Sequence, residues 1–167
     1  MTDKEQLFMR LIDEHNGMLF KVCRIYQDDD DDRNDLMQEI VLQLWLYFDS
    51  FKGQSKINTW MYRVALNTAI TFFKKQKRRP DSERLHHIVD QPEEHPEAIK
   101  DEQLRLFYKA VKHLNKVEKA LIFLYMENQS YEDIASNLGI TEGNARVRLN
   151  RIKIKLREII KTFDYEY

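Results

Sequence analysis

The chain has 167 residues, of which 43% are hydrophobic and 33% charged, a balance that suits one ordinary domain or two small ones with real cores. Four glycines and three prolines leave few residues for the turns of a sheet protein, so the composition indicates a mostly helical fold. No apolar run approaches the roughly 20 residues that cross a bilayer, the N-terminus does not resemble a signal peptide, and the lone Cys23 excludes an internal disulfide. These features predict a cytoplasmic protein without membrane insertion.

Charge is distributed unevenly along the chain, although the formal net charge is only −1. Residues 74–79 hold five basic side chains in six positions, and residues 142–161 hold seven basic side chains against two acidic ones. Between them, residues 81–101 carry seven acidic and two basic side chains. Two basic patches on either side of an acidic segment suit a polyanion that is contacted at two places.

Apolar residues at helical spacing predict a first helix over residues 3–27, in which Cys23 is expected to be a small buried hydrophobe. Five consecutive aspartates, Asp28 to Asp32, then break the pattern. We interpret them as a solvated turn and helix start, because Asp is favoured near a helix N-terminus. A metal site is the alternative, but adjacent carboxylates on a turn rarely converge on one ion.

A second helix is predicted over residues 33–48, with one broad apolar face. Its other side gathers a mixed group of side chains: Asp35, Gln38, Glu39, Leu42 and Leu46. Single exposed leucines are common on protein surfaces and need no special explanation. A compact patch that mixes leucine with carboxylates and amides also suits a protein–protein interface.

A third helix is predicted over residues 58–78, with Asn58 and Thr59 as candidate caps and Pro80 as its stop. It is rich in aromatic residues and ends in the basic stretch 74–79. Taken singly, each aromatic residue here is more often a packing residue than a ligand contact. Aromatic side chains beside a basic strip are also typical of proteins that stack unpaired bases while cations follow the backbone. The preceding loop offers small hydrogen-bonding groups that can surround an extruded base.

Residues 80–100 hold all three prolines among acidic residues and histidines, without helical periodicity. This composition predicts a flexible acidic linker. The expected fold is therefore all-α, with two small helical domains at residues 1–79 and 101–167 on either side of the linker. Helices of the second domain are predicted at residues 101–113, 115–127, 130–138 and 142–163.

The stretch around Gly139 has the spacing of a helix-turn-helix. Ser130 is placed to cap a short apolar-patterned helix, and Gly139 permits the positive φ that ends it. Ala135 is small where a crossing helix approaches, Ile140 fills the corner, and Thr141 caps the next helix. Any tight helical hairpin can contain such a turn, so the helix that follows is the better test.

That following helix separates its apolar and polar residues. The apolar stripe consists of Ala145, Leu149, Ile152, Leu156, Ile159, Ile160 and Phe163. The opposite side consists of Gly143, Val147 and Asn150, flanked by Asn144, Arg146, Arg151, Lys155 and Arg157. A DNA major groove admits one helix, with central side chains at base edges and basic ones on phosphates. A solvated cationic face is the alternative, but the turn and the basic flanks together favour DNA reading.

Three segments of the chain resemble, in order, the bacterial sigma factors of the extracytoplasmic-function (group 4) type. DLMQEIVLQLW at 35–45 is similar to region 2.2 of that family. FKGQSKINTWMYRVALNTAITFFKKQKRR at 51–79 is similar to regions 2.3 and 2.4. HLNKVEKALIFLYMENQSYEDIASNLGITEGNARVRLNRIKIKLRE at 113–158 is similar to region 4. The resemblance covers nearly all of the chain, and no segment resembles regions 1.1 or 3, which implies the minimal two-domain class.

The resemblance implies a subunit that binds core RNA polymerase and directs promoter-specific transcription initiation by recognising duplex −35 DNA and melted −10 DNA. Family docking on the clamp coiled coil of the polymerase largest subunit maps to Asp35, Gln38, Glu39 and Leu42. Recognition of the −10 element maps to Ser55, Lys56, Asn58, Trp60, Arg63 and Asn67, with Lys74, Lys75, Arg78 and Arg79 on phosphates. Recognition of the −35 element maps to Glu142, Asn144, Arg146, Val147, Arg148, Asn150 and Arg151.

Two departures from the family pattern fall in the −35 segment. Asn144 and Ala145 stand where relatives usually carry Thr-Val, and Val147 stands at a position that is often serine. The expected partners are core RNA polymerase, promoter DNA and an anti-sigma factor, which such proteins usually have. No cofactor, metal or catalytic residue is expected.

Three other functions explain the sequence less well. A helix-turn-helix transcriptional regulator that acts without polymerase docking leaves the mixed patch on the second helix unexplained. An enzyme has little support, because the five histidines do not fall at metal-ligand spacing and the aspartate run lacks a partner base. A helical adaptor predicts that charge reversal at Arg146 and Arg151 is harmless.

Overall fold

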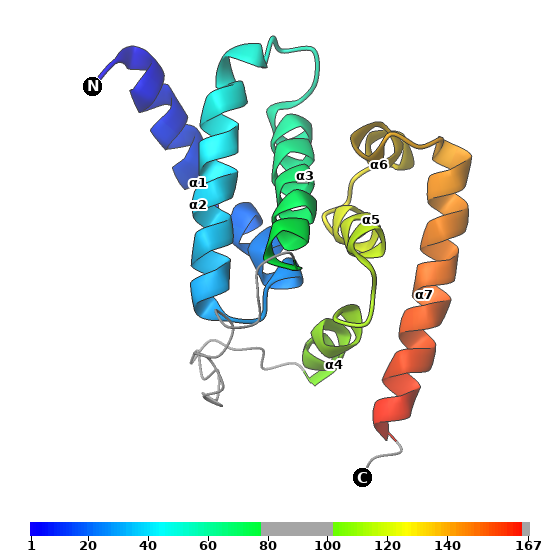
Figure 1. The fold of residues 1–167 in the computed structure, drawn as a ribbon. Coiled ribbons are helices and arrows are strands. Elements are labelled where there is room, and N and C mark those ends of the chain that lie inside the picture. Colours follow the sequence, from blue (N-terminus) through cyan, green and yellow to red (C-terminus); the bar gives the residue numbers. More distant parts are fainter. Residues whose placement is uncertain (78–101, 165–167) are drawn as a thin grey trace.

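The computed structural model describes residues 1–77 and 102–164, and these residues form seven α-helices and one short 3₁₀ turn without any strand. The first group of helices is α1 (Asp3–Tyr26), α2 (Asp30–Tyr47), η1 (Phe48–Ser50) and α3 (Ile57–Lys77). The second group is α4 (Glu102–Val111), α5 (Lys116–Met126), α6 (Tyr131–Leu138) and α7 (Glu142–Asp164). Figure 1 shows the first group on one side of the molecule and α7 along the opposite edge. The all-α prediction is confirmed.

Helices α1, α2 and α3 pack against one another as the first bundle. Thr2 and Glu5 form a capping box at the start of α1, which then runs through Gly17 without a break. Leu19, Leu36 and Leu66 are among the side chains that this bundle removes from water. Each such leucine stabilises the fold by roughly 1.5–3 kcal/mol. Cys23 is fully buried among them, as predicted.

The starts of α2 and α3 differ from the sequence prediction. The Asp29 side chain accepts hydrogen bonds from the backbone N–H groups of Asp31 and Asp32, so α2 begins earlier than predicted. Helix α3 begins at Ile57, which places Asn58 and Thr59 inside the helix rather than at its cap. The capping prediction for these two residues was therefore wrong: Thr59 is buried, and propensity alone did not reveal that the turn forms before it.

The second bundle is organised by α7, which packs against α4, α5 and α6. Asn115 and Glu118 form a capping box at the start of α5, whose buried residues include Leu121 and Leu124. The apolar stripe predicted for the last helix is buried at Ala145, Leu149, Ile152, Leu156 and Phe163. Helix α7 therefore turns one face into the bundle and leaves the other free.

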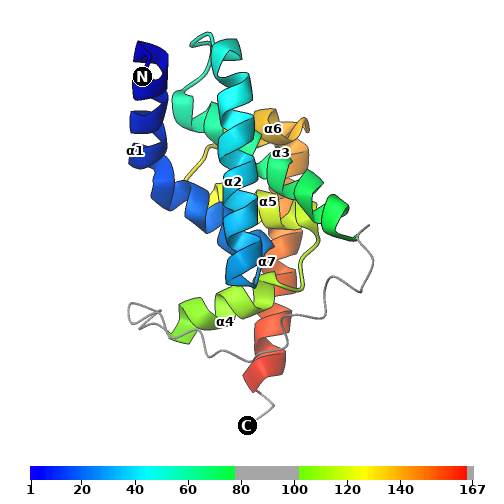
Figure 2. The same ribbon diagram turned by 60° about the vertical axis from the view of Figure 1, so that its left-hand side comes forward.

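The two bundles lie side by side in the structure. Helix α3 packs against α5 and α6, and α1 packs against α5. Figure 2 shows α5 and α6 beside α3 from a second direction. We call this arrangement the closed form.

Among the described helices, none has a stretch long and apolar enough to span a membrane.

Candidate nucleic-acid and polymerase interfaces

The corner between α6 and α7 is formed by the residues that the sequence pattern predicted for a helix-turn-helix. The Ser130 hydroxyl accepts a hydrogen bond from the Asp133 backbone N–H at the start of α6. Gly139 ends α6 in the left-handed region at φ 66°, which a residue with a Cβ adopts only with strain. The Thr141 hydroxyl accepts from the Asn144 backbone N–H at 3.1 Å and so caps α7. The predicted helix-turn-helix is confirmed in its local geometry.

The outer face of α7 presents every residue predicted to read the −35 element. All seven are exposed: Glu142, Asn144, Arg146, Val147, Arg148, Asn150 and Arg151. Arg146 pairs with Glu142 at 3.0 Å and lies 4.2 Å from the centre of the Tyr131 ring, while the Arg148 Nε donates to Asn144 Oδ1 at 3.0 Å. Because exposed pairs of this kind contribute little, these arginines can exchange them for DNA contacts.

A cleft of about 770 Å³ lies between α2, the loop after η1, α3 and one residue of α6. Four residues predicted for −10 recognition line it: Ser55, Trp60, Arg63 and Asn67. The half-buried Trp60 ring lies 6.4 Å from the Phe48 ring and 5.3 Å from the Phe51 ring, measured between centroids. Trp60 therefore packs against two aromatic rings and also lines the cleft, where an aromatic side chain can stack on an unpaired base.

Two other residues predicted for −10 recognition do not line this cleft. Lys56 is exposed beside it. Asn58 lies on another side of α3, where its Oδ1 is 2.6 Å from Nε2 of His15 on α1. The structure therefore brings Asn58 to the α1–α3 contact and not to the cleft. Arg78 and Arg79 lie outside the described residues, as do the side chains of Lys74 and Lys75.

Helix α2 contributes residues to the cleft that the sequence did not assign to DNA. Glu39, Gln43 and Tyr47 are spaced one turn apart and line it together, and Gln43 donates to Glu39 at 3.0 Å. Their i, i+4 spacing was a usable signal, because it places them on one edge of the predicted helix. The sequence pattern did not predict the helix packing that turns this edge of α2 toward α3.

The patch predicted to bind polymerase lies on the free face of α2. Asp35, Gln38 and Leu42 are exposed, and Leu42 retains 48% of its accessible surface. Leu46, one turn further on, is 63% exposed and extends the patch. Glu39 is half-buried and belongs to both the patch and the cleft. An exposed leucine pair bordered by carboxylates and an amide is suited to a protein partner.

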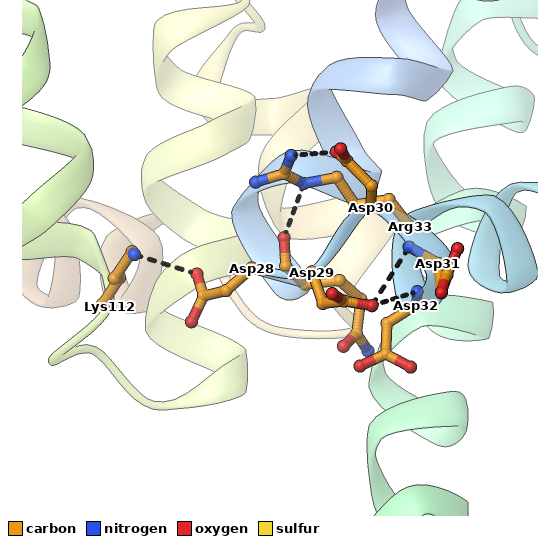
Figure 3. Close-up of polar contacts among 8 residues, drawn as sticks. Asp28, Asp29, Asp30, Asp31, Asp32, Arg33 and Lys112 are labelled. Carbon is orange, nitrogen blue, oxygen red and sulfur yellow. Dashed lines mark hydrogen bonds and ion pairs between the residues drawn. The ribbon is translucent and has the colours of Figure 1, made fainter. Parts of the chain in front are cut away.

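The aspartate run between α1 and α2 is a helix start, as interpreted from the sequence, and Figure 3 shows its contacts. Asp29 caps the helix, Asp30 pairs with Arg33 at 3.0 Å, and Asp28 reaches across to Lys112 at 3.2 Å. The carboxylates therefore point in different directions. Among the described residues no group of His, Cys, Asp and Glu is arranged to hold a metal ion.

Burial also sets the chemistry of Cys23. Desolvation by burial raises the pKa of its thiol to about 12. A backbone hydrogen bond and the charge of Arg33 act in the opposite direction and are smaller effects. The thiol is therefore protonated at neutral pH and serves as packing rather than as a nucleophile.

The fold and these surfaces define a helical protein with a helix-turn-helix and a separate aromatic cleft. Family models match it twice: Sigma-70 region 2 over residues 11–79 and Sigma-70, region 4 over residues 104–156. The chain is 32% identical over 133 residues to the ECF RNA polymerase sigma-E factor of Haemophilus influenzae, covering 71% of this chain and 69% of that protein. It is 30% identical over 131 residues to the ECF RNA polymerase sigma-E factor of Escherichia coli K12, with the same two coverages.

Two solved structures are similar in fold. The sigma factor RpoE from Bartonella quintana, in complex with the anti-sigma factor NepR, matches with a TM-score of 0.75 at 24% identity, covering 92% of this chain and 96% of that one. CnrH in complex with the cytosolic domain of CnrY matches with a TM-score of 0.68 at 17% identity, covering 95% and 90%. The chain belongs to the extracytoplasmic-function family of RNA polymerase sigma factors. It is thus a transcription initiation factor and not an enzyme.

Proposed function

We propose that this sigma factor divides its promoter recognition between two surfaces, the outer face of α7 for duplex −35 DNA and the cleft beside α3 for melted −10 DNA. The observation that carries the proposal is the presence, in one chain, of an exposed basic helix-turn-helix and a separate aromatic cleft. The first suits a groove of intact duplex. The second suits an unpaired base.

For the −35 element, α7 would lie in the major groove with Val147 and Asn150 toward base edges. Arg146, Arg148 and Arg151 extend from the same exposed face toward phosphates. Val147 offers an apolar surface to a thymine methyl group, whereas the serine common in relatives offers a hydroxyl. A base preference that differs from theirs at this position is the expected consequence.

For the −10 element, Trp60 stacks on an extruded non-template base while Asn67, Gln43 and Ser55 supply hydrogen-bonding groups around it. Extruding a base costs a few kcal/mol, and stacking contributes about 1–3 kcal/mol per base. The two effects are of similar size, so stacking can hold a melted segment that forms in the polymerase. The phosphates of the melted −10 DNA are assigned to four basic residues: Lys74, Lys75, Arg78 and Arg79.

The remaining partners are proposed on the same basis. The patch that docks on core RNA polymerase consists of Asp35, Gln38, Glu39 and Leu42, extended by Leu46. An anti-sigma factor binds the chain and keeps it inactive until a signal arrives. Both processes place the chain in the cytoplasm. The proposed domains are residues 1–79 and 101–167, joined by residues 80–100.

Run-off transcription with purified core polymerase on candidate promoters tests the function. The chain is expected to direct initiation that core polymerase alone does not support.

The double variant Gln38→Ala, Leu42→Asp tests the docking patch: polymerase binding is lost while α7 still binds −35 duplex. Arg10→Ala, which changes an exposed residue of α1 outside the patch, is the control and retains both. A chain that binds its operator sharply and regulates without ever joining polymerase would instead be an ordinary helix-turn-helix regulator.

A further inference from the structure

Two polar side chains of α2 form a hydrogen-bonded pair in the wall of the cleft beside α3. Glu39 and Gln43 lie one helical turn apart, and both line the cleft. The Gln43 Nε2 donates a hydrogen bond to the Glu39 Oε1 at 3.0 Å. Both side chains are half-buried on a regular helix, so their positions are better defined than those of side chains on the loop after η1.

The Glu39 carboxylate fixes the direction in which the Gln43 amide faces. An amide has N–H donors on its nitrogen and an acceptor on its oxygen, whereas a carboxylate only accepts. If the amide turned over, its oxygen would lie against a carboxylate oxygen with no proton between them. The Gln43 nitrogen therefore faces Glu39, and the Gln43 Oε1 is turned away from Glu39. No hydrogen bond to another described residue engages this Oε1.

Helix α3 adds acceptors to the same cleft. The Thr68 hydroxyl donates to the Val64 carbonyl at 2.7 Å. The Thr71 hydroxyl donates in the same way to the Asn67 carbonyl at 2.9 Å. Both threonines line the cleft, but their protons are directed to the backbone of their own helix. Their hydroxyl oxygens therefore offer lone pairs rather than protons to a ligand in the cleft.

Nucleobases differ in how they match such a wall. On the Watson–Crick edge, adenine and cytosine carry an exocyclic amino group beside a ring nitrogen that accepts. Guanine and thymine carry a keto oxygen beside a ring N–H. The first pattern matches an amide that presents its oxygen and its remaining N–H, which is how glutamine pairs with adenine in duplex DNA. The second pattern requires the amide to turn over, which Glu39 opposes.

We propose that Gln43 selects the extruded −10 base by accepting a hydrogen bond from its exocyclic amino group, an inference that rests on the proposed function. The base that enters the cleft is then adenine or cytosine rather than guanine or thymine. Glu39 is a positioning residue in this selection, because it acts on the base only through the Gln43 amide. The assignment of Glu39 to the polymerase patch is compatible with this role, since Glu39 borders both surfaces.

Binding of single-stranded −10 oligonucleotides to the chain assembled on core polymerase tests the proposal. Each position of the −10 segment carries each of the four bases in turn. The base preference is the affinity for the better of adenine and cytosine divided by the affinity for the better of guanine and thymine. At one position this preference should be about 10-fold, as expected for an amide that pairs with a base through two hydrogen bonds. Replacing a preferred adenine there by purine, which lacks the amino group, should cost about as much affinity.

Two variants and one control assign the preference to residues. Gln43→Leu should abolish it at that position and leave the other positions unchanged. Glu39→Gln should also abolish it, because the released Gln43 amide can then present either its oxygen or its nitrogen. Since the preference is a ratio within one variant, any loss of polymerase binding by Glu39→Gln cancels. Glu14→Gln makes the same charge change at an exposed residue of α1 and should keep the preference.

The outcomes separate this inference from the proposed function. If the preference persists in Gln43→Leu or in Glu39→Gln, the selection by Gln43 is overturned while the proposed function stands. A preference for guanine would assign the reading to a donor such as Arg63 and would overturn it as well. So would binding that depends on Trp60 but shows no base preference at any position. If the assembled complex does not bind the oligonucleotides at all, the proposed −10 function of the cleft itself fails.

Discussion

The proposed −35 surface, which is the outer face of α7, and the proposed −10 cleft beside α3 differ in how many parts of the chain build them. The first is one face of one helix, and all of its predicted residues are exposed together. The second needs α2, the loop after η1, α3 and a residue of α6. A surface made by one helix survives any rearrangement that keeps the helix folded, whereas a cleft between elements changes when they move. Under the proposed function, recognition of the −35 element therefore uses a surface that does not depend on how the helices pack together, whereas recognition of the −10 element does depend on it.

The largest expected effect is a loss of folding stability, and it tests whether the two bundles that carry these surfaces unfold independently. Leu149→Ala removes a fully buried side chain from α7 and should lower the free energy of unfolding of the second bundle by about 2–5 kcal/mol. Both tryptophans, Trp45 and Trp60, lie in the first bundle, so tryptophan fluorescence reports that bundle alone. In urea titrations, circular dichroism should shift to lower urea while the fluorescence transition stays near its original midpoint.

Leu66→Ala, in the buried face of α3, is the matched variant: the fluorescence transition should move to lower urea, while the part of the circular dichroism change that comes from the second bundle stays at its original midpoint. Equal shifts of both probes in both variants would mean that the closed form unfolds as one unit, and the contrast between the two surfaces would then concern binding only.

The next largest expected effect concerns base stacking, which is proposed for the cleft and not for α7. Trp60→Ala should weaken binding of a single-stranded −10 oligonucleotide by about 1–3 kcal/mol, the value of one stacked base, and leave −35 duplex binding unchanged. Fluorescence anisotropy with the two labelled DNAs measures both. Trp60→Phe keeps an aromatic face and the packing on Phe51, so it should retain most of the affinity. Equal losses for the alanine and phenylalanine variants would contradict the stacking role, because Trp60→Phe keeps an aromatic face for the base.

The same contrast explains what the sequence could predict. The caps at Ser130 and Thr141, the left-handed Gly139 and the exposed face of α7 all depend on residues within one or two turns of each other, and each prediction was confirmed. Asn58 was assigned to DNA, but its contact with His15, 43 residues away in sequence, depends on how α1 and α3 pack. The role of Gln43 in the cleft was missed for the same reason.

A smaller effect separates two glycines of the helix-turn-helix. Gly139→Ala forces a side chain into the left-handed region and should destabilise the second bundle by about 1–2 kcal/mol. Gly143→Ala should do the opposite and stabilise α7 by up to about 1 kcal/mol, because the position is helical and a Cβ there meets no atom within 4 Å. Urea titration by circular dichroism measures both. A shift of the same sign in the two variants would contradict the assigned roles.

The smallest effect concerns how α7 holds DNA. Arg151 is exposed on the outer face, and removing one phosphate contact should reduce the slope of log affinity against log salt by about 0.9. Between 50 and 200 mM salt, Arg151→Ala should therefore lose roughly threefold less −35 affinity than the natural chain does. Lys161→Ala removes the same charge near the far end of α7, where Lys161 pairs with Glu158, and should leave the slope unchanged. The reduction should be equal for cognate and unrelated duplexes, since a phosphate contact carries no sequence information. A loss confined to the cognate duplex would instead place Arg151 at a base edge, and α7 would then sit in the groove rotated toward that side.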